Sequence, residues 1–516
     1  MQLHTSIAIL LGALGLPQAK PLVAAGKAAE TTSSATIATT ALNPTAHLPK
    51  GPWWQCFEDP QLGRLLEQVT ANNQELKIAL ARHDQARSLI KIARSRLLPN
   101  LSLPMSAERQ RTSENMASPF PLNGLHFVGD VYQVGAQVAW ELDLSGKLSK
   151  GVALGKAQSL SAADLLHNTL LMLQAEAASH YFRLRTLDAE RELVEQSLRW
   201  RSESLNIAKA RAQAGAGSEL ELEQSLTEIS SAQAELSALA LMRDNTQAAL
   251  ALLLGQDASR FALSARSSAM PAPPSIPAKL STELLQRRPD VSAAERQWQS
   301  AILAIGITRA DFFPSLQIGG FAGLQALSFG DLFNPASALW AVGPRLTLPF
   351  TQLGFNRARM EQARANHDEA LARFRQSLLT AISETHGNMR QLHHLREQAA
   401  VQIRACTSAK RAAQLAQTRY ESGSSPYLEV IEANRSMLAM QRASAQIAGQ
   451  RLQASVQLIK ALGGGWQPLP ADANAKTIEQ SLPAGIRPDP LSEVRPARPS
   501  KPGWWSRLFG KKPRDP

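Results

Sequence analysis

The side chains that could catalyse a reaction or bind a metal are few and dispersed in this 516-residue chain. Cys56 and Cys406 lie far apart, with no CxxC and no histidine at ligand spacing, which leaves a disulfide open but favours two free thiols. Of ten histidines, only His393 and His394 adjoin, and they face different sides of one predicted helix. The glycine run 463–465 follows a predicted helix, which is typical of a cap rather than a phosphate cradle.

No G-x-S-x-G, H-E-x-x-H, P-loop or Rossmann fingerprint is present. The sequence therefore predicts no catalytic, cofactor-binding or metal-binding residue, and the protein is not expected to be an enzyme. The net charge of +12 could suggest nucleic-acid binding. However, the basic residues are scattered, and no cluster of aromatic and basic residues typical of single-strand binders occurs. Nucleic acid is therefore not an expected partner.

Two stretches alternate between apolar and polar residues, as in strands with two different faces. One spans residues 132–144 and the other residues 340–350, and shorter partners begin at Leu101 and Leu316. Because no segment has ~20 consecutive apolar residues, a membrane crossing would require a closed β-barrel. Four strands are too few, since a small barrel needs about eight, so several chains would have to pool their strands. A soluble sandwich would alternate in the same way.

Very long helices are predicted between the strands. No proline occurs from residue 145 to about 214, a length that corresponds to roughly 100 Å of helix. Heptad spacing predicts coiled-coil packing in this segment and the next. The apolar positions are Leu166, Leu170, Leu173, Ala177, Leu184, Leu187, Val194, Leu198, Leu205 and Ala208, followed by Leu222, Leu226, Ile229, Leu236, Ala240, Leu250 and Leu254.

The strand–helix–turn–helix unit occurs twice, at an offset of about 210 residues. Each helix pair is joined by a short turn in which glycine ends one helix and serine opens the next. These turns lie at the far end of the helices from the strands. The first comprises Gly215, Ala216, Gly217 and Ser218, and the second Gly423, Ser424 and Ser425.

Composition divides the chain into six segments. The apolar run 7–16 has the length of a signal-peptide core and is too short to span a bilayer. Proline marks a linker between the repeats and a basic tail that we expect to be disordered. The expected segments are a signal peptide (1–25), a flexible N-terminal segment (26–52), a first repeat (53–270), a linker (271–282), a second repeat (283–468) and the tail (469–516).

A set of short motifs occurs in a specific order between residues 53 and 466. They are Trp53 and Trp54 with residues 55–62, Pro99 with 96–98, the stretch 140–147, Arg288, Pro289 and Asp290 with 294–296, Pro314 with 312–315, and the stretch 458–466. In this order the chain resembles the TolC-type outer-membrane efflux proteins, and within them the OprM- and NodT-like branch. These motif residues have structural roles, because Pro289 suits a first helical turn and Pro99 and Pro314 suit a helix-to-strand change.

The resemblance implies a mainly helical fold with membrane β-structure, in which a homotrimer pools four strands per chain into a 12-stranded β-barrel surrounded by outer-membrane lipid. Its helices would form an α-barrel through the periplasm of a Gram-negative bacterium. The helical turns would dock on a periplasmic adaptor (membrane fusion) protein, which links indirectly to an inner-membrane transporter. The chain would passively conduct small toxic compounds to the exterior.

The resemblance also implies a periplasmic gate of acidic and tyrosine residues near the second turn. Here that stretch contains Thr418, Arg419, Tyr420 and Glu421. Tyr420 and Glu421 could pair across the trimer axis with Arg211 or Arg419, or all of them could be solvated helix ends.

Two other functions remain open. One is an outer-membrane duct for type I protein secretion, and the other is a non-transport trimeric coiled-coil surface or scaffold protein. The Trp53-Trp54 and Arg288-Pro289-Asp290 motifs favour efflux over secretion, and the duplication argues against a scaffold. Many members of the branch are acylated at an N-terminal cysteine. None follows the apolar run here, so membrane anchoring would rest on the barrel alone.

Overall fold

A computed structural model of the protein describes residues 52–111, 128–213, 218–265, 271–274, 287–348 and 352–466, together with residues 470, 477 and 480. All of them belong to one compact unit, residues 44–516. The expected signal peptide, nearly all of the flexible N-terminal segment, and most of the linker and of the C-terminal tail lie outside the described residues. None of the helices in the described part of the chain has an apolar stretch long enough to cross a membrane.

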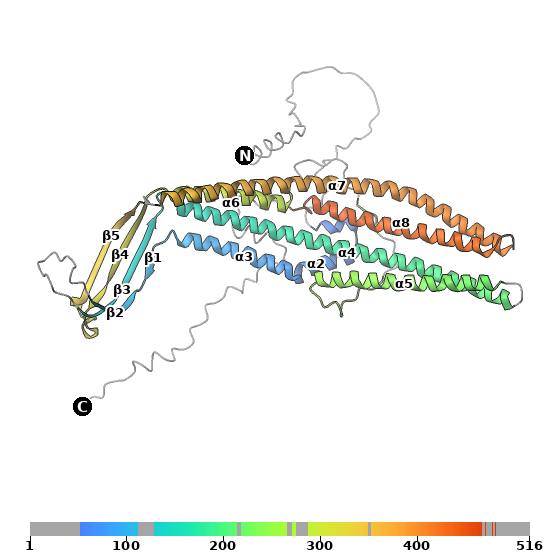
Figure 1. The fold of residues 1–516 in the computed structure, drawn as a ribbon, viewed down its shortest axis with the longest axis horizontal. Helices are drawn as coiled ribbons and strands as arrows, with labels where there is room; N and C mark the ends of the chain where they lie inside the picture. The colour runs from blue at the N-terminus through green and yellow to red at the C-terminus, as the bar shows by residue number, and fades with distance from the viewer. Residues whose placement is uncertain are drawn as a thin grey trace, which may run out of the picture. The chain divides into compact units, whose positions relative to one another are not determined.

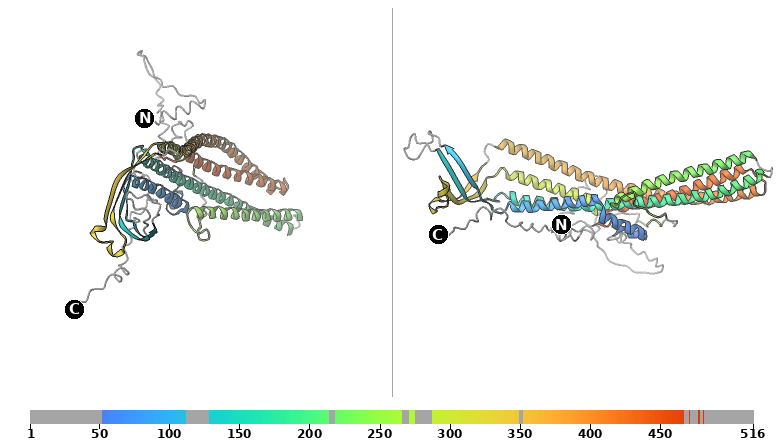
Figure 2. Two further views of the ribbon diagram at one scale, coloured as in Figure 1. Left: turned by 60° about the vertical axis from the view of Figure 1, so that its left-hand side comes forward. Right: turned by 90° about the horizontal axis from the view of Figure 1, so that it is seen from below.

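Two very long helices dominate the fold. Helix α4 spans Lys147–Gln213, which is 67 residues, and α7 spans Leu353–Glu421, which is 69 residues. At 1.5 Å per residue each is about 100 Å long, as the sequence predicts. Each packs against a shorter helix that returns from its far end. These are α5 (Glu219–Leu253) beside α4, and α8 (Tyr427–Ala461) beside α7 (Figures 1 and 2).

The other helices fill the half of the fold nearer the strands. Helix α3 (Gln74–Ser95) packs along α4, and α6 (Pro289–Ala310) packs between α4 and α7 (Figure 1). Near the strands the helices therefore pack in the order α3–α4–α6–α7. In the other half α4 also contacts α8. The short helix α2 (Pro60–Asn72), preceded by the 3₁₀ turn η1 (Trp53–Phe57), packs on the middle of α4.

The strands of the described residues form one antiparallel sheet in the order β1-β3-β4-β5, with β2 also paired to β3. The bounds are β1 Asn100–Ser102, β2 Met105–Arg111, β3 Val128–Leu142, β4 Ser315–Ala326 and β5 Ala338–Thr347. Between β4 and β5 lie two 3₁₀ turns, η3 (Phe329–Asp331) and η4 (Pro335–Ser337).

Strands β3 and β5 begin a few residues earlier than predicted and also end earlier, and β1 and β2 are separate. Two of these differences have a local cause. The expected first strand is divided into β1 and β2 at Pro104, which has no N–H to donate to the ladder but accepts one from Gly135 at 3.2 Å. Strand β3 ends at Leu142 rather than at residue 144. The reason is that the Asp143 carboxylate accepts the N–H groups of Leu148 and Ser149, which begins helix α4.

The register confirms that the sheet has two chemically different faces. Trp140 lies opposite Ile318, and Ala322 lies opposite Trp340, so these apolar residues share one face. The other face carries the polar residues Gln133, Gln137, Glu141, Gln317, Gln325 and Arg345, interspersed mostly with glycine and alanine.

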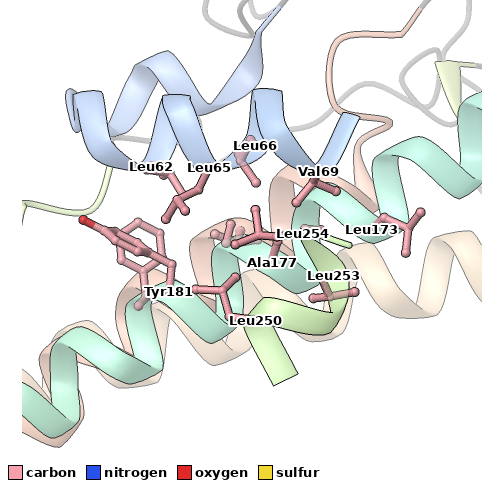
Figure 3. Close-up of a cluster of buried hydrophobic side chains, with 14 of the residues drawn as sticks. Leu62, Leu65, Leu66, Val69, Leu173, Ala177, Tyr181, Leu250, Leu253 and Leu254 are labelled. Carbon is pink, nitrogen blue, oxygen red and sulfur yellow. The ribbon is translucent and has the colours of Figure 1, made fainter. Parts of the chain in front are cut away.

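The largest core lies where α2 and the end of α5 pack on the middle of α4 (Figure 3). It contains Leu62 and Leu66 of α2, Ala177 and Tyr181 of α4, and Leu250 of α5, all of them buried. The Tyr181 hydroxyl also donates to the Asp59 carboxylate at 2.6 Å, and Asp59 caps α2. The core and its polar anchor therefore fix α2 on α4.

The predicted heptad holds for α4 but not throughout α5. From Leu166 to Ala208 the predicted positions of α4 are buried, apart from the partly buried Leu198. In the turn-proximal half of α5, Leu226 is exposed, whereas Glu228 and Ala232 are buried. Leu222, Ile229 and Leu236 are partly buried, so the predicted register is wrong for Leu226 and Ala240 and not for every position. At those places α5 turns small residues and a paired carboxylate toward its neighbours.

The glycine run after α8 is a helix cap, as predicted. Gly463, Gly464 and Gly465 all have positive φ angles, of 87°, 57° and 83°. The Gly463 N–H donates to the carbonyl of Lys460 at 2.9 Å. A Cβ atom added at Gly463 would lie 2.3 Å from the carbonyl oxygen of Arg287, so only glycine fits this turn.

We expect Gly463→Ala to lower the free energy of unfolding by roughly 2 kcal/mol, because it adds both a steric clash and an unfavourable φ. The matched control is Gly387→Ala in α7, where an added Cβ meets nothing within 4 Å. That variant should be as stable as the parent or more stable by about 0.5–1 kcal/mol. Denaturant unfolding of the purified variants measures both. Equal stability of the two would contradict the role assigned to Gly463.

Candidate functional site

The apolar face of the sheet is exposed in the single chain. On β5, Trp340 is 78% exposed, Val342 70% and Leu346 67%, and on β2 Met105 is 77% exposed. The sheet is also open, since β5 at one edge and β1 and β2 at the other each pair with one strand only among the described residues. Such a surface needs a covering partner or an apolar solvent, and the edges need further strands.

The turns between the long helices form the second feature. In the first turn, the Ser218 hydroxyl accepts the N–H of Leu220 at 3.2 Å and begins α5. Gly215, Ala216 and Gly217 lie outside the described residues, so their docking role stays a prediction.

In the second turn, Gly423 adopts a φ of 73° and its N–H donates to the carbonyl of Tyr420 at 3.0 Å, which ends α7. The Ser424 hydroxyl donates to the Arg419 carbonyl at 3.0 Å, and Ser425 follows just before α8. The docking role of these residues is likewise untested.

An exposed leucine stands on the first turn of each returning helix. Leu220 of α5 is 64% exposed and Leu428 of α8 is 50% exposed. Both precede a glutamate, Glu221 and Glu429, so they occupy matching positions of the two repeats. Neither was singled out from the sequence, although the repeated Leu-Glu pair could have revealed them. Together they place an apolar side chain at the end of each helix pair.

The predicted gate residues have other partners within the chain. Arg419 forms an ion pair with Glu429 at 3.0 Å across the second turn, and Glu421 accepts a hydrogen bond from Gln417 at 2.8 Å. Tyr420 is buried, with its ring 5.3 Å from that of Tyr427. These contacts rigidify the turn. Pairing across a trimer axis stays a prediction.

The two remaining predicted gate residues are Thr418 and Arg211. The Thr418 hydroxyl donates to the carbonyl of Gln414 at 3.0 Å within α7. The side chain of Arg211 lies outside the described residues.

An ion-pair network that the sequence did not predict links the two helix pairs farther from the turns. Glu228 of α5 has a side chain that is only 7% exposed. It accepts a hydrogen bond from Arg435 Nε of α8 at 3.0 Å and forms a 3.1 Å ion pair with Arg201 of α4. The hydrogen bond to Glu228 raises the pKa of Arg435. A buried carboxylate therefore joins three helices.

A second pair lies one heptad away. Arg442 of α8 binds the carboxylate of Glu235 on α5 and that of the buried Glu190 on α4, the latter at 3.1 Å. Glu190 also accepts a hydrogen bond from Gln446 at 2.9 Å. We refer to Glu228, Glu235, Arg435 and Arg442 as the inter-hairpin zipper.

The spacing of the zipper contains a signal that sequence reasoning missed. Glu228 and Arg435 are separated by 207 residues, and so are Glu235 and Arg442. Leu220 and Leu428 are 208 residues apart, so each arginine lies one position before the residue that is equivalent to its glutamate. A comparison of the two repeats that also allowed a shift of one position would have revealed these opposite charges.

The family-type motif residues lie at junctions between elements. Arg288 donates to Asp290 at 2.7 Å, to Glu384 of α7 at 2.8 Å, and to the carbonyl of Ala461 at the end of α8 at 3.2 Å. Pro289 is the first residue of α6. Arg288 therefore ties α6, α7 and α8 together, which is a structural role.

The remaining motif residues also make structural contacts. Trp53 is buried, donates from Nε1 to Gln174 of α4 at 3.3 Å, and lies edge-on to Trp54 with ring centres 5.9 Å apart. Pro99 and Pro314 stand directly before β1 and β4, where a helix has just ended. Both tryptophans therefore help to hold η1 on α4.

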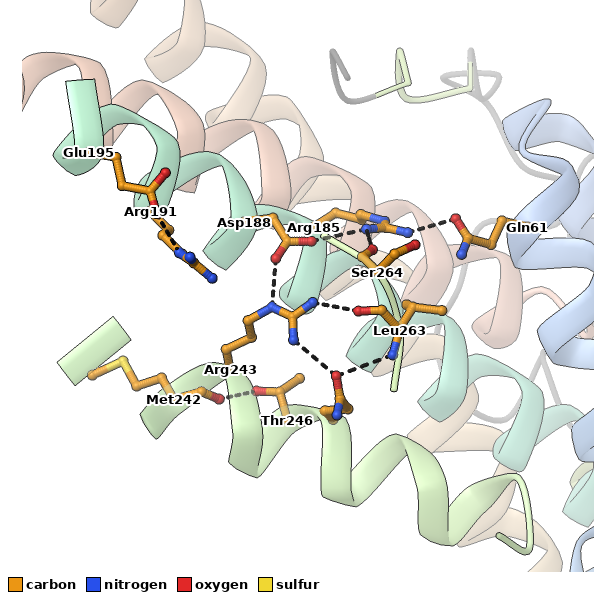
Figure 4. A network of polar contacts seen from close by, with 11 residues as sticks. Gln61, Arg185, Asp188, Arg191, Glu195, Met242, Arg243, Thr246, Leu263 and Ser264 are labelled. Carbon is orange, nitrogen blue, oxygen red and sulfur yellow. Dashed lines mark hydrogen bonds and ion pairs between the residues drawn. The ribbon is translucent and has the colours of Figure 1, made fainter. Parts of the chain in front are cut away.

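A polar network attaches the segment after α5 to the helices (Figure 4). Asp188 of α4, which is buried, accepts from Arg185 at 3.0 Å and from Arg243 of α5 at 2.8 Å. Arg243 also donates to the carbonyl of Leu263 at 2.6 Å, and Arg185 donates to Gln61 at 2.6 Å. All its members have structural partners, so it offers no site for chemistry.

Within the described ranges, no group of three or more His, Cys, Asp or Glu side chains lies close enough to hold a metal ion. Cys56 and Cys406 are both free thiols, and burial raises the pKa of Cys56 to about 11. The candidate site therefore has three parts: the exposed apolar face of the sheet, the two helical turns, and the inter-hairpin zipper that joins the two helix pairs.

Comparison with known proteins gives a consistent result. The family model described as outer membrane efflux protein matches residues 65–256 and 280–464. The solvent efflux pump outer membrane protein SrpC of Pseudomonas putida is 32% identical over 419 residues, which cover 81% of this chain and 88% of that protein. The pyoverdine export outer membrane protein OpmQ of Pseudomonas aeruginosa is 30% identical, over 80% of this chain and 87% of the relative.

Solved structures share the fold. The outer-membrane channel OprN has a TM-score of 0.75 and 28% identity, covering 86% of this chain and all of OprN. The outer membrane protein VceC of Vibrio cholerae has a TM-score of 0.73 and 27% identity, covering 81% of this chain and all of VceC. The two helix pairs, the two-faced sheet and these matches lead to one conclusion: the chain belongs to the outer membrane efflux protein family.

Proposed function

We propose that this protein is the outer-membrane channel subunit of a tripartite efflux system in a Gram-negative bacterium. The observation that carries the proposal is the sheet, which has one exposed apolar face, one polar face and two open edges. An apolar outer face and a polar inner face are the properties of a strand in a membrane channel. A passive channel needs no catalytic residue, and we propose no enzymatic activity.

We further propose that the channel is a homotrimer. Each chain offers four strand positions, with β1 and β2 counted as one, so three chains joined from β5 to the next β1 would close a 12-stranded barrel in outer-membrane lipid. Closure would satisfy both open edges. Helices α3, α4, α6 and α7 continue directly from the strands and would form an α-barrel in the periplasm. The two repeats, residues 53–270 and 283–468, would contribute equally.

The helical turns are the surfaces best suited to a periplasmic adaptor protein, through which the channel would meet an inner-membrane transporter. They lie farthest from the sheet along α4 and α7, and each exposes a leucine, Leu220 or Leu428. Gly423 and its neighbours hold the second turn in a fixed conformation. We propose that Gly215, Ala216, Gly217, Ser218, Gly423, Ser424 and Ser425 belong to the same docking surface.

The cargo class follows from the names of relatives. SrpC is described as part of a solvent efflux pump and OpmQ as a pyoverdine exporter. Both cargoes are small molecules, so we propose that this protein conducts small compounds rather than secreted proteins.

Purified protein added to a planar bilayer should give discrete conductance steps, because a closed trimer encloses a continuous pore. Cells that lack the protein should become sensitive to at least one toxic small compound. An unrelated soluble coiled-coil protein serves as the control for the bilayer. Absence of steps from detergent-stable trimers would exclude a channel, and loss of a secreted protein without any change in sensitivity would favour type I secretion.

We expect Arg442→Glu to raise single-channel conductance, because it would place three carboxylates together and push α8 away from α4 and α5. The matched control is Arg411→Glu, an exposed residue of α7 with the same change in charge. Adding Glu235→Lys to Arg442→Glu should partly restore the original conductance. Unchanged conductance in trimers of Arg442→Glu would show that the zipper does not restrict the pore.

The combined variant Leu220→Glu and Leu428→Glu should abolish efflux-dependent resistance while the protein stays in the outer membrane, since two buried charges would oppose adaptor docking. Leu241→Glu is the control, because Leu241 is 63% exposed on α5 but far from the turn. Resistance and membrane content are measured in the same cells. Full resistance in the combined variant would remove these leucines from the docking surface.

A further inference from the structure

A pocket of about 620 Å³ lies where the end of α6 meets the start of α7. Its charged lining comes from Arg309 of α6 and from Arg357 and Arg364 of α7, together with one acid, Glu361. Arg357 and Arg364 are seven residues apart, so they project from the same side of the helix. The pocket therefore has an excess of positive charge.

These three arginines differ from the basic residues beside them. Lys147 and Arg359 at the same level both pair with Asp311, at 2.7 Å and 3.2 Å. Among the described residues, Arg309, Arg357 and Arg364 form no ion pair, although Glu361 lines the same pocket. Three guanidinium groups that line one pocket and outnumber its single carboxylate are suited to an anion, and their planar donors match the oxygens of a phosphate.

The rest of the lining is apolar. Phe312, Phe313 and Met360 contribute to it, and Phe313 is 55% exposed. A small hydrated anion would gain nothing from these side chains. An anion that carries a hydrocarbon part would cover them and remove apolar surface from water.

The level of the pocket in the fold indicates the source of such a molecule. An exposed apolar residue stands at or near each junction between a helix and a strand, namely Leu98, Leu144, Phe313 and Leu353. Figure 1 shows that these junctions lie at one level, at the base of the sheet. If the sheet crosses the outer membrane, as proposed above, this level coincides with the headgroups of the periplasmic leaflet.

We propose that this pocket binds the phosphate of an anionic phospholipid, with Arg309, Arg357 and Arg364 around the headgroup and the Phe312–Met360 side of the pocket against its hydrocarbon. The assignment of the source to lipid rests on the proposed function, but the phosphate chemistry of the pocket does not. One lipid would bind per chain and hold the junction between helices and strands at the membrane surface.

The test uses the full chain purified in detergent and titrated with phosphatidylglycerol, with phosphatidylcholine or with inorganic phosphate, while native mass spectrometry counts the bound molecules. The pocket variant carries Arg357→Gln and Arg364→Gln. The matched control carries Arg375→Gln and Arg390→Gln, two exposed arginines of the same helix outside the pocket. Circular dichroism and trimer content establish that both variants fold.

We expect saturable binding of one phosphatidylglycerol per chain, about tenfold weaker in the pocket variant and unchanged in the control. Equal binding by the two variants would overturn the site. Equally tight binding of phosphatidylcholine would overturn recognition of an anion. Inorganic phosphate that displaces phosphatidylglycerol at equal concentration would overturn the lipid as the source.

Bilayer conductance of the same preparations separates this inference from the proposed function. Conducting trimers that bind no phosphatidylglycerol would reject the lipid site alone. Protein that binds the lipid through the pocket but never conducts would reject the channel alone.

Discussion

Backbone N–H and C=O groups that are kept from water must be paired within protein. As far as the structure describes the chain, its sheet leaves two edges without such pairing. Its apolar face also lacks a covering partner, since Trp340 and Val342 are exposed. In the proposed assembly, copies of the chain would join edge to edge in an apolar medium. This would pair the open edges and remove the apolar face from water. Four helices continue directly from the strands. In the proposed trimer, the arrangement of the strands would therefore also determine how those helices are placed around the common axis.

The duplication supplies two similar helix pairs, but the pairs are not equivalent. The first repeat contributes Glu228 and Glu235 and the second contributes Arg435 and Arg442, and these opposite charges attract the two repeats to each other. Glu190 is buried, so removing Arg442 would leave its carboxylate without an ion pair among the described residues, which is costly. Glu228 would keep Arg201 if Arg435 were removed.

Much of the fold follows from local chemistry and could be predicted. The strict alternation in β3 and β5, the proline-free length of α4 and the glycine caps each depend on residues close in sequence. The register of α5 could not be predicted, because Leu226 and Glu228 exchange their expected environments only when α4 and α8 supply arginines. The zipper and the pocket between α6 and α7 were missed for the same reason. Their members are distant in sequence, and no local pattern marks them.

The cluster of hydrogen bonds around Arg288 has a mechanical consequence. It fixes α7 at Glu384, near the middle of the helix, to α6 and to the end of α8. Beyond Glu384, α7 continues to Glu421 as an arm of roughly 55 Å. If the arm pivots there, a tilt of only about 5° would displace its end by roughly 5 Å, which is about one helical turn. Such a pivot would amplify small angular changes near the middle of the helix into a large displacement of the turn, without requiring the strands at the opposite end to move.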